Sequence, residues 1–338
     1  MDRPTIRDIA SVANVSPTAV SFVLNSKPGV SEATRERVLA VAKQMGWTPN
    51  AAARALSASK ANAVGLVIAR PETSLSSERF FFGLLVGIQA RLKRDNMDLV
   101  LQISNNISEE IETYRTWWGQ RRVDGVVVVD PRLDDPRPAA LEDLGMPAVF
   151  VGEPVEGFSC VVGNDEGMIT DIAKHLASQG AKRIGYLTGL ASLVHTQRRQ
   201  RALTRFGLQH GIDIIVSSET DYSEQSGISE TNRLLDARRP LDAIIFDNEI
   251  LALGGAQAIN AHGLQIGKDI LTASCEDSPI CRVLTPPMTA AAREPALLGE
   301  HAAQLLLSVF DGEEPKIFAE NVPKIIERPS STRQRTGA

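Results

Sequence analysis

The sequence predicts an α/β protein with two parts: a small all-α domain at the N-terminus and a larger body of doubly wound parallel sheets. Within the first sixty residues, apolar side chains recur at helical spacing in three short segments. From residue 63 onward, short apolar runs such as "AVGLVIA" alternate with amphipathic segments, which is the pattern of consecutive β-α-β units. The chain of 338 residues is long enough for two or three separate cores.

Two short helices joined by a tight turn are predicted first. Thr5 can cap the first helix, and Asp8 lies in its first turn, where an acidic side chain suits the helix dipole. After the turn "NVS", Ser16 can cap the second helix, and Pro17 occupies its first position. The apolar side chains that can pack these helices are Ile6, Ile9, Ala10, Ala13, Ala19, Val20, Val23 and Leu24.

A third helix is predicted over residues 31–47, after a break at "SKPG". Ser31 is its expected cap, and its apolar face is expected to consist of Val38, Leu39, Val41, Ala42 and Met45. Two short helices, a tight turn and a third helix that completes the core form a helix-turn-helix unit, whose second helix enters the major groove of DNA. The spacing alone fits any three-helix bundle equally well.

The body alternates apolar strands with amphipathic helices. The expected strands are 63–69, 97–104, 123–130, 146–153, 183–189, 242–247 and 270–277. The expected helices include 81–96, 107–122, 138–145, 164–180, a long one that ends at Gly211, 248–263 and 296–312. The series restarts at residue 164, so two lobes are predicted, with a ligand crevice at the carboxyl ends of their strands.

The charge distribution favours a polyanion as the partner of the N-terminal part. Residues 1–60 carry eight basic and four acidic side chains, whereas the rest of the chain carries 28 basic and 37 acidic ones. A basic end on an acidic body is typical of a chain whose end meets a polyanion while its body stays in solution.

Several classes of protein are not expected. The sequence has no run of about 18 apolar residues and no signal-peptide pattern, so a cytoplasmic protein without a membrane partner is expected. The three cysteines and five histidines show no ligand spacing, so neither a metal nor a cofactor is expected. No GxSxG, GxGxxG, phosphate-loop or HExxH motif occurs. The pairs Glu109–Glu110 and Asp134–Asp135 are interpreted as solvated faces or loops, so no catalytic residue is assigned and no enzyme is expected.

The first sixty residues strongly resemble, without a gap, the N-terminus of the LacI/GalR family of bacterial repressors. The residues that carry this resemblance are Thr5, Asp8, Ala10, Ala13, Val15, Ser16, Val20, Ser21, Leu24, Asn25, Val30, Thr34, Arg35, Val38, Gly46, Pro49, Asn50, Ala53 and Leu56. The resemblance implies a DNA-binding domain over 1–48 and a hinge helix with its linker over 49–61. It also implies DNA contacts from Thr5, Ser16, Pro17, Thr18, Ser21, Phe22, Asn25, Ser31, Asn50, Ala53, Arg54 and Leu56.

In that family, Pro17, Thr18 and Phe22 occupy base-reading positions. Many relatives carry Arg in place of Phe22, and Arg can grip guanine with two hydrogen bonds, whereas Phe can contact a thymine methyl group. Weaker guanine selectivity at that base pair is therefore predicted, unless the ring turns inward and packs. Leu56 is expected to wedge into the minor groove from the hinge helix, which is too short to hold its shape alone in water.

The body resembles the family's effector domain, whose fold is like that of periplasmic sugar-binding proteins. The matching words are "RIGYLTG", "DNEILALGGAQAI" and "SCEDSPICRVLTPPMTA". The resemblance implies an effector-binding and dimerisation domain over 62–328, with lobe 1 at 62–161 and 290–320, and lobe 2 at 162–289 and 321–328. The tail 329–338 is polar and is expected to be disordered. The effector contacts implied by position are Phe81, Arg199, Tyr222, Asn248 and Glu276.

A polyol suits these residues, because its hydroxyl pairs bind carboxylate, amide and arginine groups, and its C–H groups stack on an aromatic ring. The resemblance therefore implies a homodimeric repressor that binds a palindromic double-stranded operator and responds to a small effector, expected to be a sugar. A corepressor-dependent regulator that senses a purine-like or other non-sugar metabolite is the alternative. Ala202 and Glu276 depart from the family pattern, which often has Gly and Asp at those positions.

Overall fold

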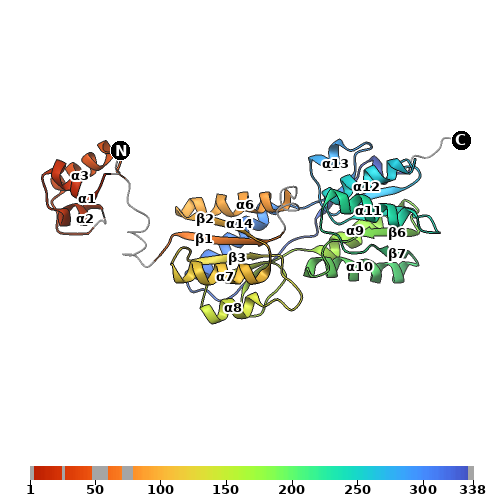
Figure 1. Ribbon diagram of the computed structural model, residues 1–338, viewed down its shortest axis with the longest axis horizontal. Coiled ribbons are helices and arrows are strands. Elements are labelled where there is room, and N and C mark those ends of the chain that lie inside the picture. Colours follow the sequence, from red (N-terminus) through yellow and green to blue (C-terminus); the bar gives the residue numbers. More distant parts are fainter. Residues whose placement is uncertain (1–3, 25–26, 48–59, 71–78, 334–338) are drawn as a thin grey trace. The chain divides into compact units, whose positions relative to one another are not determined.

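The computed structural model describes residues 4–24, 27–47, 60–70 and 79–333. The chain divides into two compact units, Met1–Ala61 and Asn62–Ala338 (Figure 1). The described part of the first unit is all helical, and the second unit contains two mainly parallel sheets covered by helices. This arrangement confirms the predicted fold class.

The N-terminal unit contains α1 (Ile6–Ala13), α2 (Pro17–Leu24) and α3 (Glu32–Gln44). Their buried side chains form one core, which consists of Ile9, Ala10, Ala13, Val20, Val23, Val38 and Ala42. Leu39 was expected on the apolar face of α3, but its side chain is 48% exposed. Arg35 links α3 to the end of α2, because its guanidinium donates to the backbone oxygens of Val23 (3.4 Å) and Lys27 (3.2 Å).

The predicted caps of the first two helices are confirmed; Ser31 stands at the predicted N-cap position of the third helix but makes no side-chain capping hydrogen bond. The Asp8 amide donates to the Thr5 hydroxyl (3.4 Å) and the Thr5 amide to the Asp8 carboxylate (2.7 Å), which completes a capping box. An amide in the first turn of α2 donates to Ser16 Oγ (3.1 Å). Ser31 stands at the N-cap of α3, but its hydroxyl contacts the Thr34 hydroxyl (3.0 Å) instead of a backbone amide.

The first sheet of the second unit has the strand order β11-β5-β4-β3-β1-β2, with all neighbours parallel. The strands are β1 (Ala63–Ala69), β2 (Asp98–Ser104), β3 (Gly125–Val129), β4 (Ala148–Gly152), β5 (Ser159–Val162) and β11 (Ile317–Ala319). Helices α6 (Arg79–Leu92) and α14 (Pro295–Phe310) cover one face; α7 (Ile107–Gly119) and α8 (Arg137–Leu144) lie on the other (Figure 1). Because β1 and β3 are buried along their whole length, they appear in the sequence as unbroken apolar runs.

The second sheet has the order β12-β10-β9-β8-β6-β7. Its strands are β6 (Arg183–Leu187), β7 (Asp213–Val216), β8 (Ala243–Phe246), β9 (Leu271–Ser274), β10 (Thr289–Ala292) and β12 (Lys324–Ile326), of which β12 runs antiparallel to β10. Helices α9 (Asp165–Ser178) and α10 (Val194–His210) pack on one face. Helices α11 (Glu224–Leu235), α12 (Glu249–Ala261) and α13 (Pro279–Val283) lie on the other side (Figure 1). No helix in the described ranges is long and apolar enough to cross a membrane.

The chain crosses between the two sheets three times in the described residues: after β5, after β10 and between β11 and β12. The predicted bounds place the return of the chain to the first lobe at residue 290. Instead, β10 pairs with β9 through Ala290 and belongs to the second sheet, so the first lobe resumes only after Ala292.

The C-terminal residues that the structure describes are not disordered, so the predicted tail is wrong for 329–333. Pro329–Ser331 form a short 3₁₀ helix, and both of its serines are fully buried. Ser330 Oγ donates to the Thr272 backbone oxygen (2.7 Å) and accepts from the Thr289 amide (2.9 Å). The Ser330 hydroxyl thus satisfies two backbone groups of the second sheet, which a composition rule for polar tails does not detect. Residues 334–338 lie outside the described ranges.

Candidate functional site

A cavity opens within the second unit, between the two lobes. It is bounded by residues that follow the strands of both sheets, among them Arg70 after β1, Asp130 after β3 and Asp247 after β8. The space between its atoms totals about 680 Å³, part of which is open to solvent. The carboxyl ends of parallel strands are where ligands bind in sheets of this kind.

All five residues that the sequence predicted as effector contacts line this one cavity: Phe81, Arg199, Tyr222, Asn248 and Glu276. Phe81 belongs to the first lobe and the others to the second. The residues span almost two hundred positions of the chain, so only the fold brings them together. Their role in binding stays a prediction.

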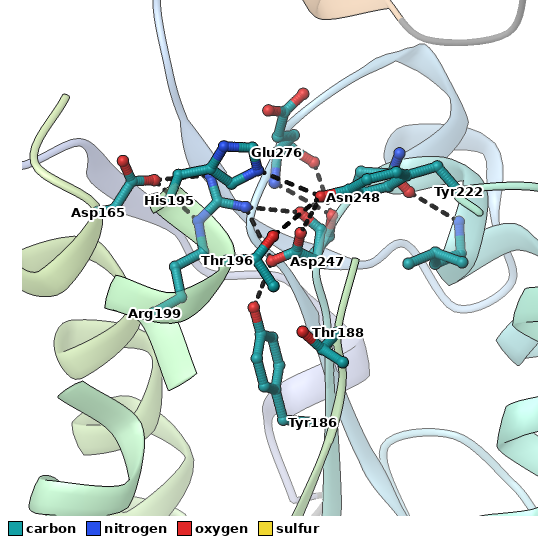
Figure 2. A network of polar contacts seen from close by, with 12 residues as sticks. Asp165, Tyr186, Thr188, His195, Thr196, Arg199, Tyr222, Asp247, Asn248 and Glu276 are labelled. Atoms are coloured by element: carbon teal, nitrogen blue, oxygen red, sulfur yellow. Dashed lines mark hydrogen bonds and ion pairs between the residues drawn. The ribbon is translucent and has the colours of Figure 1, made fainter. Parts of the chain in front are cut away.

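Arg199 is buried and is held between two carboxylates (Figure 2). Its Nε and Nη2 lie 2.8 and 2.7 Å from Asp165 Oδ1, and its Nη1 lies 2.8 Å from Asp247 Oδ1 and 3.2 Å from the Asp247 backbone oxygen. Burial alone would lower the pKa of Arg199, but Asp247 and Asp165 outweigh burial and raise it well above its usual range. Most of the hydrogen-bond donors of the Arg199 guanidinium are therefore bound to carboxylates of the protein itself.

Asp247 is the centre of a buried network. Its Oδ1 also accepts from the Tyr186 hydroxyl, and its Oδ2 accepts from the Tyr222 hydroxyl at 2.8 Å. Burial raises the pKa of Asp247, but the Arg199 guanidinium and the hydrogen bonds from Tyr186 and Arg199 outweigh burial, so the pKa of Asp247 is lowered. Asp247 is thus a carboxylate whose position is fixed by three neighbours.

His195 lies beside this network with its Nε2 3.2 Å from the Tyr222 hydroxyl. Burial and the nearby Arg199 guanidinium lower its pKa from 6.5 to about 4, although Asp165, Asp247 and Asp130 act in the opposite direction. The imidazole is therefore neutral at pH 7 and adds no charge to the cavity.

Asn248 offers a donor to a ligand. Its Oδ1 caps α12 by accepting from the amides of Ile250 (3.1 Å) and Leu251 (2.9 Å). Its Nδ2 is buried and has no hydrogen-bond partner among the described residues. A buried amide group without a partner costs free energy, which a ligand oxygen at this point of the cavity would recover.

The ring of Tyr222 is covered by Arg70 from the other lobe. The guanidinium carbon of Arg70 lies 4.8 Å from the centre of the Tyr222 ring and 5.8 Å from that of Phe81. Arg70 also donates from Nε to Asp130 Oδ2 at 2.6 Å. The ring that was predicted to stack on the effector therefore already stacks on a cation of the protein.

Glu276 pairs with Arg293, whose Nη1 lies 3.4 Å from the Glu276 carboxylate and 3.9 Å from that of Asp165. The Arg293 guanidinium also lies 5.1 Å from the centre of the Phe80 ring. Arg293 stands where the chain crosses between the lobes, directly after β10. The pair thus places one positive and one negative group beside a segment that connects the two lobes.

The cavity contains six polar residues that the sequence analysis missed: Arg70, Asp130, Asp165, His195, Asp247 and Arg293. Arg70, Asp130 and Asp247 each follow an apolar strand directly, so the rule that strand ends carry the site could have found them. No comparable signal marks the others. In the described parts of the chain, no group of His, Cys, Asp and Glu is arranged to hold a metal ion.

Short contacts join the two lobes beside the cavity. The Leu133 amide donates to the Ser192 oxygen, and the Val194 amide donates to the Pro131 oxygen, each at 3.0 Å. A salt bridge of 2.6 Å between Arg198 and Glu153 adds a second link. The loop after β3 and the start of α10 are therefore held together across the cleft.

The predicted DNA contacts fall into two groups. Thr5, Ser16, Pro17, Thr18 and Ser31 are exposed, and Ser21 is half-buried. Asn25, Asn50, Ala53, Arg54 and Leu56 lie outside the described residues. Phe22 is half-buried, and the site of a side chain on Gly29 would lie 3.6 Å from its ring. The ring thus packs beside the turn after α2, whereas the core of the unit is made by Ile9, Val20 and their neighbours.

Comparison with known sequences supports both units. The profile described as bacterial regulatory proteins, lacI family, matches residues 5–50, and the profile of a periplasmic binding protein-like domain matches residues 173–331. The transcriptional regulator AglR of Rhizobium meliloti (strain 1021) is 30% identical over 277 residues, which is 80% of this chain and 77% of AglR.

Two further proteins resemble this one. The transcriptional regulator CelR of Thermobifida fusca is 29% identical over 319 residues, 92% of this chain and 93% of CelR. The structure described as a CelR–cellobiose complex has a TM-score of 0.74 at 26% identity, over 97% of this chain and all of that one. The lac repressor dimer bound to operator and the anti-inducer ONPF has a TM-score of 0.87 at 23% identity, over 98% of this chain and all of that one, which shows a shared fold.

Proposed function

Because the chain belongs to the LacI family of bacterial regulatory proteins and is a DNA-binding transcriptional regulator, we propose that it is a repressor whose hold on its operator is controlled by a sugar. The sugar binds in the cavity between the lobes, and two chains act together as a homodimer. One helix-turn-helix unit per chain reads half of a palindromic site, so two chains are required.

The cavity is the observation that carries this proposal. Five residues chosen from the sequence as polyol contacts line it together, and Asn248 Nδ2 has no hydrogen-bond partner in the part of the chain that the structure describes. Carboxylate, guanidinium, amide and aromatic groups converge on one space, as recognition of a polyol requires. CelR, whose structure is described as a complex with cellobiose, resembles this chain over nearly its whole length.

The DNA contacts proposed for the N-terminal unit follow from α2. Pro17 and Thr18 stand exposed in its first turn, where a recognition helix presents side chains to base edges. We assign the unit 1–48 to operator binding, 49–61 to the hinge and 62–328 to effector binding and dimerisation. Leu56, which lies outside the described residues, is proposed as the minor-groove wedge, and Leu56→Ala should weaken operator binding without altering sugar binding.

A ligand screen on the full chain tests the effector. Thermal unfolding is measured with neutral mono- and disaccharides that include cellobiose, and with purine bases. A ligand present at 100 times its Kd adds about 2.7 kcal/mol to the free energy of unfolding, enough to move the midpoint. Asn248→Ala should abolish a true sugar shift, whereas Asn232→Ala, at a half-buried position of α11 that does not line the cavity, should keep it.

The effect of the ligand on operator affinity shows whether it is an inducer or a corepressor. A sugar that stabilises the chain should lower its affinity for operator DNA, as measured by fluorescence anisotropy. A shift with purines alone, together with tighter DNA binding, would contradict the proposal and support a corepressor scheme.

A further inference from the structure

The cavity carries more negative than positive side chains. The charged residues that line it are Arg70, Arg199, Arg293, Asp130, Asp165, Asp247 and Glu276, three guanidinium groups against four carboxylates. His195 does not restore the balance, because its pKa of about 4 leaves it neutral at pH 7. The lining therefore has a formal charge of minus one when the acids are ionised.

The acids are held ionised by the arginines. Burial would raise the pKa of Asp130, but Arg70 lowers it below the usual range. Burial also opposes ionisation of Asp165, and here Arg199 and Arg293 reverse the effect. The negative charges of Asp130 and Asp165 are thus present at neutral pH and are fixed in position by salt bridges.

Every guanidinium that lines the cavity already faces a carboxylate of the protein. Arg70 contacts Asp130 at 2.6 Å, as described above, and Arg293 contacts Glu276 at 3.4 Å. Arg199 is shared by two acids. An anionic ligand group could gain an arginine only by displacing one of these carboxylates, which would then be left buried without its partner.

Ligand hydroxyl groups form more favourable interactions with the side chains of this cavity than ligand anions do. A carboxylate accepts hydrogen bonds and donates none, so a surplus of carboxylates calls for donors on the ligand. A hydroxyl can donate to a carboxylate such as Glu276 and accept from a donor such as Asn248 Nδ2. A phosphate dianion or a uronate carboxylate offers only acceptors at the charged end, and like charges in a partly desolvated site repel strongly.

We propose that the cavity selects an effector without negative charge: a neutral polyol binds, an amine substituent is tolerated, and a carboxylate or phosphate substituent is rejected. This inference rests on the proposed sugar effector. It narrows the effector to one charge class, and it makes the surplus carboxylate the determinant of specificity.

Matched pairs of sugars test it on the full chain by calorimetric titration. The pairs are D-glucose with D-glucuronate, D-galactose with D-galacturonate, and cellobiose with cellobiose 6′-phosphate, and D-glucosamine is compared with D-glucose. Within any pair that binds, the anionic member should bind at least about tenfold more weakly, which corresponds to about 1.4 kcal/mol. The amino sugar should bind within about threefold of its neutral parent or more tightly.

Two Glu→Gln variants separate the charge of the cavity from the charge of the whole protein. Glu276→Gln removes one carboxylate from the lining, and Glu314→Gln removes one from an exposed position between α14 and β11. The ratio of neutral to anionic affinity should fall at least about threefold in Glu276→Gln and stay unchanged in Glu314→Gln. Because the ratio is measured within one variant, a general loss of affinity does not affect it.

The outcomes distinguish this inference from the proposed function. An anionic sugar that binds as tightly as its neutral partner would overturn the inference and leave the sugar effector standing. An affinity ratio that is the same in both variants would also overturn it. Failure of every sugar to bind a folded, operator-binding chain would overturn the proposed effector, and the inference with it.

Discussion

The guanidinium carbon of Arg70 lies 4.8 Å from the centre of the Tyr222 ring, although the two residues belong to different lobes. Arg70 follows β1 of the first sheet, and Tyr222 precedes α11 of the second lobe with a left-handed backbone (φ 64°). The contact joins the lobes across the cavity, in addition to the backbone hydrogen bond between Val194 and Pro131.

A double-mutant cycle measures this contact. Arg70→Met and Tyr222→Leu should each lower the free energy of unfolding, and their coupling should be about 0.5–2 kcal/mol, the range for a cation–π pair that is partly desolvated. Urea unfolding of the four proteins gives the coupling. The same cycle with Leu208→Ala, on the exposed face of α10, should give no coupling. Zero coupling in the first cycle would show that the stacked arrangement contributes nothing.

Phe22→Arg should change which base pair the protein prefers. Arginine can donate two hydrogen bonds to guanine, and such a pair gives about 1–3 kcal/mol of discrimination. The Phe22 ring packs beside Gly29 and stands apart from the core, so the substitution should leave the fold intact. Selection from a randomised operator library should reveal a new guanine preference at one position of each half-site. Phe22→Ala is the control and should gain no such preference; an unchanged profile in Phe22→Arg would refute base contact at this residue.

Stability should fall as the pH drops from 6.5 to 4 because of His195. Its pKa is about 4 in the folded protein and 6.5 in the unfolded chain, so between these values the unfolded state binds more protons. The free energy of unfolding therefore rises with pH across this window, by at most about 3 kcal/mol from this group. The groups that face it are Arg199, Asp165, Asp247 and Asp130.

The measurement is the difference between the wild type and His195→Gln in urea unfolding at several pH values. The raised carboxylate pKa values elsewhere in the chain are common to both proteins and cancel. The free energy of unfolding of the wild type minus that of His195→Gln should rise by up to about 3 kcal/mol between pH 4 and pH 6.5 and should stay constant above pH 6.5. A difference that does not vary with pH would contradict the burial of a neutral imidazole.

Gly87→Ala should destabilise the first lobe. A Cβ atom on Gly87 would lie 1.8 Å from the backbone oxygen of Ala296, because α6 and α14 approach closely there. Backbone cannot move aside as a side chain can, so a cost of about 1–3 kcal/mol or more is expected in thermal or urea unfolding. Gly119→Ala is the matched control, since nothing lies within 4 Å of its Cβ position at the end of α7. It should be neutral or stabilise by up to about 1 kcal/mol.

Local signals in the sequence predicted most of the fold. The capping box of Thr5 and Asp8 is decided by residues three positions apart, and the strands β1 and β3 are visible as apolar runs because both faces are buried. Ser31 makes no capping hydrogen bond, and its hydroxyl contacts the Thr34 hydroxyl instead. Such competition between two local partners is not visible in a pattern.

The candidate site was only partly predictable. Positions matched by resemblance, such as Asn248, do line the cavity, but the partners of Arg199 did not follow from the sequence. Asp165 and Asp247 lie 34 and 48 residues from it, and only the fold makes them neighbours. Arg199 was expected to donate its guanidinium hydrogen bonds to the effector. In the structure these hydrogen bonds go to the carboxylates of Asp165 and Asp247.

The order of strands along the chain has a consequence for synthesis on the ribosome. The N-terminal unit has been synthesised once Ala61 is added, whereas the two sheets lack β11 and β12 until the end of the chain is synthesised. Translation adds about 5–20 residues per second, so roughly 10–50 seconds separate the two events. During that interval the nascent protein has a finished DNA-binding unit, while the edge of β5 that later receives β11 has no strand beside it. An unpaired edge of this kind can pair with a strand of another chain, so the effector domain is exposed to wrong pairing until β11 is synthesised.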